Sequence, residues 1–92
     1  MTDHMTDHAH ARMQQRGISM RTLESLLDYG AVAYDHRGAT IVYFNKKAKS
    51  RVRRLVGRQA YRALEKQLNT YAVVAGDGAV VTVGRRDRRI PR

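Results

Sequence analysis

The stretch that decides the fold is YAVVAGDGAVVTV, residues 71–83. Two runs rich in small and β-branched side chains, 71–75 and 79–83, flank a Gly-Asp-Gly sequence. β-Branched residues favour extended backbone, and glycine-rich segments of this length are typical of tight turns between antiparallel strands. The pattern therefore predicts a β-hairpin near the end of the chain.

A second pair of strand-like runs lies upstream. Residues 31–35 (AVAYD) and 39–45 (ATIVYFN) are separated by 36–38, which end in glycine, and they predict another hairpin. We expect both hairpins to join one antiparallel sheet. Its core face is expected to consist of alternate members of the set Val32, Tyr34, Ile41, Tyr43, Val73, Val80 and Val81.

Helices are predicted before the first hairpin. A short helix is expected from Thr6 onward and is ended by Gly17, a residue suited to the left-handed conformation at a helix C-terminus. Ser19 is a good N-cap for a second helix that ends at Gly30. The apolar stripe of that helix, at the spacing expected for one helical face, consists of Leu23, Leu26 and Leu27.

The domain boundaries follow from repeats and composition. The opening MTDH is repeated at residues 5–8, so residues 1–5 are expected to be a duplicated or disordered start. Residues 6–84 are predicted to form a single α+β domain. The terminal RRDRRIPR, residues 85–92, holds little apolar surface and is expected to be a flexible basic tail.

The positive charge is concentrated between the hairpins. The chain has 18 Lys plus Arg against 8 Asp plus Glu, a formal charge of +10, and residues 46–66 carry nine of these bases and one acid. Residues 47–56 and 58–68 are predicted to be two helical pieces that are kinked or broken at Gly57, because their apolar stripes differ in phase there. One ridge of this segment is expected to carry Lys47, Arg51, Arg54, Arg58 and Arg62.

A ridge of like charges indicates a polyanionic partner. Repulsion between cations at these spacings destabilises a helix unless phosphates neutralise it, whereas a purely solubilising face usually alternates acids and bases. The alternative, a solvated face, stays open. The ridge predicts phosphate contact rather than base readout, and nucleic acid is favoured over a membrane surface because the segment has no Trp or Phe.

Length and composition exclude several classes of protein. A chain of 92 residues accommodates one small core, and the absence of Cys excludes disulfides, thiolate nucleophiles and Cys-based metal sites. The longest apolar runs are far shorter than the roughly 20 residues that span a bilayer. We expect a soluble, cytoplasmic protein without membrane association, cofactor or metal; a chelating trio of Asp7, His8 and His10 is disfavoured because it lies near the chain end.

Two residue types could transfer protons. His8 and His36 are the histidines considered for general acid–base work, although a helix-start histidine can equally bond to the backbone. Each tyrosine can fill the core or contact a phosphate or an unpaired base. No Ser/His/Asp set, carboxylate pair or glycine-rich phosphate loop is evident.

Both ends of the chain resemble a known group of proteins. The run His8-Ala9-x-x-Arg12-Met13-x-x-Arg16-Gly17-Ile18, together with VVTV at 80–83 followed by basic residues, resembles a widespread prokaryotic domain of unknown function related to the RelE and BrnT toxin superfamily. The resemblance implies a compact α+β domain and, in the toxin relatives, metal-independent ribonuclease activity. By position, His8, Arg12 and Arg16 match the first motif, and Arg85 and Arg86 match the second. The chain departs from this pattern in its basic segment, 46–68.

We therefore expect a toxin-like ribonuclease in which a ribose 2′-hydroxyl attacks the adjacent phosphate. The roles expected are proton transfer by His8 or Tyr43 and charge stabilisation by Arg12, Arg16 and Arg85. The ridge and Arg86 would hold the nucleic acid, with RNA favoured over DNA. Two alternatives stay open: a noncatalytic nucleic-acid-binding or regulatory module, and an interaction module for an acidic partner such as an antitoxin. The oligomeric state is not predicted.

Overall fold

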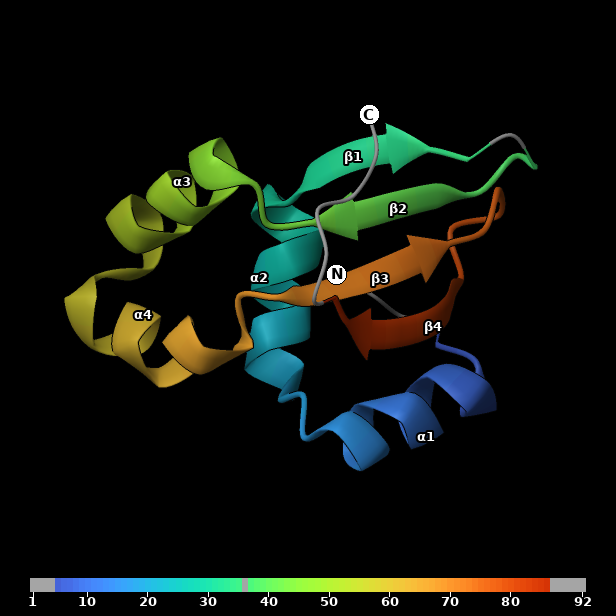
Figure 1. Cartoon of the computed structure of the whole chain (residues 1–92), viewed down its shortest axis with the longest axis horizontal. Helices are drawn as coiled ribbons and strands as arrows, with labels where there is room; N and C mark the ends of the chain where they lie inside the picture. The colour runs from blue at the N-terminus through green and yellow to red at the C-terminus, as the bar shows by residue number, and fades with distance from the viewer. Residues whose placement is uncertain (1–4, 36, 87–92) are drawn as a thin grey trace.

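One four-stranded antiparallel sheet, ordered β1-β2-β3-β4, organises the protein (Figure 1). The computed structural model describes residues 5–35 and 37–86. In chain order its elements are α1 (Asp7–Arg16), α2 (Met20–Tyr29), β1 (Ala31–Tyr34), β2 (Thr40–Tyr43), α3 (Lys46–Val56), α4 (Arg58–Leu64), the 3-10 helix η1 (Glu65–Gln67), β3 (Thr70–Val74) and β4 (Val80–Arg85). The predicted α+β class, with two hairpins and a helical segment between them, is confirmed.

The buried face of the sheet differs from the prediction. Val42, Ala72 and Val83 face the core in one cross-strand row. Val32 shares this row, yet it is 52% exposed because β1 is the edge strand, and Tyr34 on the same strand is 80% exposed. The expected residues that are only half-buried are Ile41, Tyr43, Val73 and Val81, so Val80 is the one member of the set that is buried. On these strands, the residues that face either side of the sheet are mostly apolar. The alternation of apolar and polar residues alone could therefore not identify the core face.

Helix α2 covers the core face of the sheet, and α1 packs along β4 (Figure 1). Leu23 and Leu26 of α2 are fully buried in one cluster with Phe44. Ala9 and Met13 of α1 join the same cluster. Apolar residues three and four positions apart thus turn one face of each helix toward the sheet, as the sequence predicted for α2.

The start of α1 is attached directly to β4. Thr6 caps the helix by accepting a hydrogen bond from the Ala9 amide (3.1 Å), and its own amide donates to the Val80 carbonyl (3.1 Å). The Thr6 hydroxyl also donates to the Val81 carbonyl (3.2 Å). Met5 forms an isolated parallel bridge with Val80, so this residue belongs with the domain rather than with the excluded start; residues 1–4 lie outside the described residues.

The basic segment forms a helical lobe, α3, α4 and η1, inserted between β2 and β3 (Figure 1). Asn45 caps α3 by accepting a hydrogen bond from the Ala48 amide (2.8 Å). Gly57 has φ +89°, a conformation that L side chains rarely adopt, and the chain turns there so that α4 packs against α3. The predicted break is confirmed. The five predicted ridge cations are divided between these two helices, three on α3 and two on α4.

The C-terminal boundary lies later than expected. Arg85 is the last residue of β4, opposite Thr70, and the Arg86 amide donates to the Asn69 carbonyl (2.8 Å). Both residues were expected in a flexible tail, but backbone pairing with the start of β3 holds them in the domain. The rest of the expected tail, 87–92, lies outside the described residues.

Candidate nucleic-acid interface

The face of the sheet opposite α2 carries a row of tyrosines. Tyr43, Tyr71 and Gly84 are cross-strand neighbours on β2, β3 and β4, and both tyrosines are half-buried. Within the described part of the chain, no helix lies over this face (Figure 1). A Cβ atom at position 84 would lie 2.9 Å from both Cε1 and Oη of Tyr71. Glycine at this position therefore lets the Tyr71 ring lean across β4 toward α1.

Three arginines line a pocket together with Tyr71. Arg12 and Arg16 stand one turn apart on the same ridge of α1, and Arg85 follows Gly84 on β4. With Tyr71 and Thr82 they line a small hollow of about 80 Å³, together with Val83 and Gly84. We call it the sheet-edge pocket. Arg85 also donates a long hydrogen bond from Nη2 to the Gly17 carbonyl (3.4 Å), which ties β4 to the end of α1.

The structure brings together three of the five predicted catalytic candidates. Arg12, Arg16 and Arg85 line the sheet-edge pocket, although the first two and the third come from opposite ends of the chain. His8 is exposed one turn before Arg12 on the same ridge of α1 and does not line the pocket. Tyr43 lies opposite Tyr71 but does not line it either. His36 lies outside the described residues.

Arg86 is engaged with the protein itself. Its guanidinium carbon lies 5.2 Å from the centroid of the Tyr43 ring, within the range of a cation–π contact, and Nη2 donates to the Phe44 carbonyl (2.8 Å). Arg86 was expected to bind nucleic acid. Its contacts within the protein join the end of β4 to the end of β2, beside the tyrosine row, and the nucleic-acid role stays a prediction.

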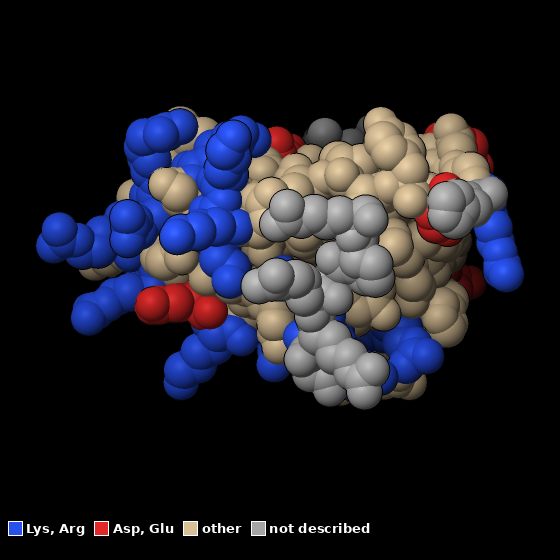
Figure 2. Space-filling model, turned by 45° about the horizontal axis from the view of Figure 1, so that its top comes forward, with Lys and Arg blue, Asp and Glu red and all other residues tan. Residues whose placement is uncertain are grey.

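The helical lobe carries the other predicted cations. All five are exposed, and Figure 2 shows Lys and Arg side chains gathered at the lobe end of the molecule. Among the residues that the structure describes, no carboxylate forms an ion pair with any of them. Lys47, Arg51 and Arg54 belong to α3, and Arg58 and Arg62 belong to α4. The lobe therefore presents cations that its own acids leave uncompensated.

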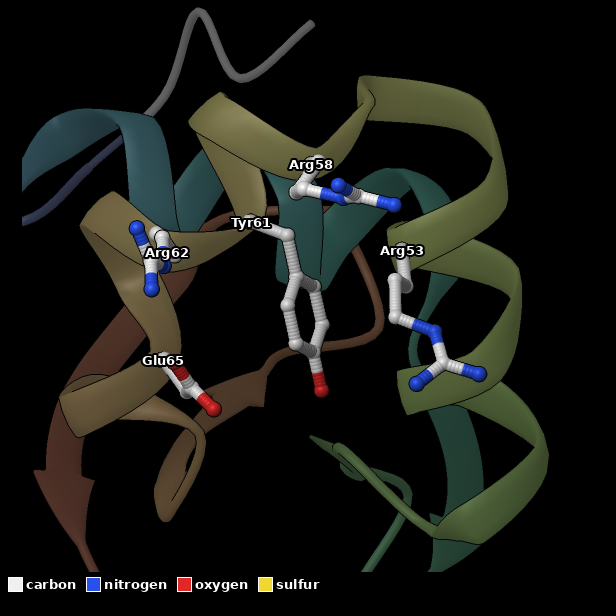
Figure 3. Close-up of a pocket in the computed structure, with 5 residues that line it drawn as sticks. All are labelled: Arg53, Arg58, Tyr61, Arg62 and Glu65. Atoms are coloured by element: carbon white, nitrogen blue, oxygen red, sulfur yellow. The ribbon is translucent and has the colours of Figure 1, made fainter.

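A second pocket lies between the helices of the lobe. It has a volume of about 450 Å³ and is lined by Arg53, Arg58, Tyr61, Arg62 and Glu65. Figure 3 shows Tyr61 standing between Arg53 of α3 on one side and Arg62 and Glu65 on the other. We call it the lobe pocket.

Sequence reasoning missed Arg53, Tyr61 and Tyr71. Arg53 and Tyr61 lie four residues before and after Gly57, so a turn at that glycine is the signal that could have paired them. In the sequence, Tyr71 is one of five tyrosines, and nothing near it in the chain distinguishes it from the others. Its register against Gly84, which singles it out, is a property of the assembled sheet.

The described residues include neither a candidate metal site nor a candidate membrane-spanning helix. No three His, Asp or Glu side chains in this part of the chain lie close enough to hold a metal ion. No helix within it is long and apolar enough to cross a bilayer.

The architecture and the site define a small α+β domain with arginine–tyrosine pockets on a cationic surface. The chain belongs to the family described as Domain of unknown function (DUF4258), which matches residues 5–85. The matched span includes α1, β4 and the whole helical lobe, so both pockets lie within it. No curated protein and no solved structure matches the chain.

Proposed function

We propose that this domain is a metal-independent endoribonuclease of the RelE and BrnT toxin type, with the sheet-edge pocket as its active site and the lobe as its RNA-binding surface. The observation that carries the proposal is the convergence of Arg12, Arg16 and Arg85 on one pocket that Tyr71 also lines. Cations from separate elements repel one another, so their gathering in a polar hollow is best explained by an anionic ligand. The resemblance of the N-terminal motif to that superfamily supports the same reaction.

The reaction is an attack of a ribose 2′-oxygen on the neighbouring phosphorus. The 2′-hydroxyl loses its proton, the bond from phosphorus to the 5′-oxygen breaks, and that oxygen gains a proton. The products are a 2′,3′-cyclic phosphate and a 5′-hydroxyl. The transient phosphorane carries more negative charge than the starting phosphodiester, and guanidinium groups placed around it stabilise that charge in the transition state.

Tyr71 takes the role that the sequence suggested for Tyr43. Tyr71 lines the pocket, whereas the Tyr43 ring is covered by the guanidinium of Arg86. In the proposed mechanism the Tyr71 hydroxyl donates to the phosphate or the departing 5′-oxygen. His8, on the same ridge as Arg12, remains the candidate that accepts the 2′-proton.

Incubation of purified protein with end-labelled single-stranded RNA in EDTA tests the proposal. We expect cleavage that follows the protein peak on a sizing column and leaves cyclic phosphate ends. Arg12→Gln and Arg85→Gln should each lower the single-turnover rate about 100-fold or more, the usual effect of removing one charge-stabilising donor. Tyr71→Phe keeps the ring beside Gly84 and should also slow cleavage.

The matched control is Arg21→Gln, an exposed arginine of α2 that does not line the sheet-edge pocket, and it should leave the rate unchanged. Absence of cleavage by the wild-type protein, or equal rates for Arg12→Gln and Arg21→Gln, would contradict the proposal. Salt-sensitive RNA retention without cleavage would instead favour the noncatalytic module, which the unpaired lobe cations also support. Stable copurification with an acidic protein would favour the interaction module.

A further inference from the structure

The lobe pocket has no role in the cleavage step proposed above. Its lining combines three guanidinium groups, a phenol and a carboxylate within about 450 Å³, a size typical of small-molecule sites. The sheet-edge pocket, at about 80 Å³, is much smaller. A ligand that suits the lobe pocket must offer more than a bare phosphate.

The lining chemistry indicates the parts of that ligand. The guanidinium groups of Arg53, Arg58 and Arg62 can donate paired hydrogen bonds to phosphate oxygens. The half-buried Tyr61 supplies an aromatic surface on which a planar base can stack. Glu65 would repel a phosphate, but its carboxylate can accept a hydrogen bond from an amino group of a base.

We propose that the lobe pocket binds one nucleotide of a single-stranded RNA, with its phosphate on the arginines, its base against Tyr61 and an amino group of the base on Glu65. Bases in a duplex are paired and stacked, so only an unpaired nucleotide can enter such a pocket. Cytosine is the base to test, because it carries an amino group where uracil carries a carbonyl oxygen.

The position of the lobe connects this pocket to the cleavage site. The lobe is inserted between the end of β2, at Tyr43, and the start of β3, at Thr70. It therefore emerges from the end of the sheet that holds the tyrosine row and Arg85. The inference rests on the proposed function in treating the bound nucleotide as part of an RNA substrate, for which the lobe pocket selects the base outside the scissile bond.

Mononucleotide binding tests the inference without cleavage, because CMP and UMP contain no phosphodiester bond. Each is titrated into the full-length protein and followed by the amide NMR signals, with inorganic phosphate as a third ligand. We expect CMP to shift the signals of the lobe-pocket residues and to bind more tightly than UMP or phosphate. Tyr61→Ala should weaken CMP binding about tenfold, the usual scale of a lost stacking contact.

Two variants separate binding from folding. Tyr61→Phe keeps the ring and should retain CMP affinity, whereas Glu65→Gln, an exposed change, should reduce the preference for CMP over UMP. Tyr34→Ala is the matched tyrosine control, since Tyr34 is 80% exposed on the edge strand β1. CMP binding no tighter than that of phosphate, equal CMP and UMP affinities, or shifts confined to the sheet-edge pocket would overturn the inference. Loss of RNA cleavage with intact CMP selectivity would count against the proposed function alone.

Discussion

The sheet-edge pocket and the lobe pocket use the same side chains, arginine and tyrosine, on different supports. In the first, Tyr71 lies on an inner strand paired on both sides, and Arg12 extends from a helix whose capping residue bonds to β4. In the second, every lining residue lies on α3, α4 or η1, which contribute Ala48, Val52 and Leu64 to the core but carry none of the lining residues on a paired strand.

The backbone holds the lining residues of the two pockets differently, and this difference indicates which pocket suits cleavage and which suits binding. A phosphorane must meet its donors within a few tenths of an ångström, so cleavage requires rigidly held groups, such as those on a strand paired on both sides. Holding a flexible RNA strand needs charge and stacking surface but tolerates looser placement. α4 begins at Gly57 without a side-chain cap, in contrast to α1, which is capped by Thr6. We therefore assign chemistry to the sheet edge and binding to the lobe.

Among changes that replace no pocket arginine, the largest effect that separates the two sites is expected from Gly84→Ala. The added Cβ would meet the Tyr71 ring at 2.9 Å, so the ring must move away from the arginines. Overpacking of this kind destabilises a fold by about 1–3 kcal/mol. We expect a lower melting temperature and at least tenfold slower RNA cleavage, about the scale of one misplaced catalytic group. CMP binding to the lobe should be unchanged.

Gly76→Ala is the matched glycine control. Its nearest neighbour to an added Cβ is the Gly38 carbonyl oxygen at 3.7 Å, an ordinary contact. Cleavage by this variant should equal that of the wild-type protein. Equal activity of Gly84→Ala and Gly76→Ala would mean that the position of Tyr71 is unimportant and would break the contrast between the two sites.

A smaller effect is expected on the salt dependence of RNA binding. Each phosphate contact adds about 0.7 to the negative slope of log affinity against log salt for single strands, so five lobe cations predict a slope of roughly −3.5. Simultaneous Lys47→Gln, Arg51→Gln and Arg54→Gln should leave roughly −1.4. Fluorescence anisotropy with labelled RNA at several salt concentrations measures both values.

Paired Arg21→Gln and Arg37→Glu changes, outside the lobe and the sheet-edge pocket, lower the net charge by three, as the triple variant does, and provide the control for net charge. This variant should keep the wild-type slope. A slope that falls equally in the control and in the triple variant would show that binding follows total charge, and the lobe would lose its assigned role.

The smallest effects are expected from the caps of the two cationic helices. Thr6→Ala removes the acceptor for the Ala9 amide in α1, and Asn45→Ala removes the acceptor for the Ala48 amide in α3. Each should lower the free energy of unfolding by about 1 kcal/mol, measured by urea denaturation. Thr6→Ala should reduce cleavage more than RNA affinity, and Asn45→Ala should do the reverse. Identical losses of both activities in the two variants would contradict the division.

Much of the fold was predictable because its signals are local. Turn residues, β-branched runs and the capping residue Ser19 depend on near neighbours in the chain, and they marked the hairpins and α2 correctly. The break at Gly57 was also local, since a phase change of the apolar stripe reveals it. The direction of the chain after that glycine depends on long-range packing, so the sequence could not show how the cations of α3 and α4 lie relative to one another.

The sequence by itself determined the α+β class and the concentration of charge in the lobe, and it singled out Arg12, Arg16 and Arg85, the arginines of the sheet-edge pocket. Only the tertiary structure decided that Tyr71 rather than Tyr43 lies beside them, and that Arg53 and Tyr61 share a pocket with Arg62. Strand register and helix packing set these neighbours. Both are decided by which apolar faces the whole chain can bury together, a choice among long-range contacts that no short stretch of sequence contains.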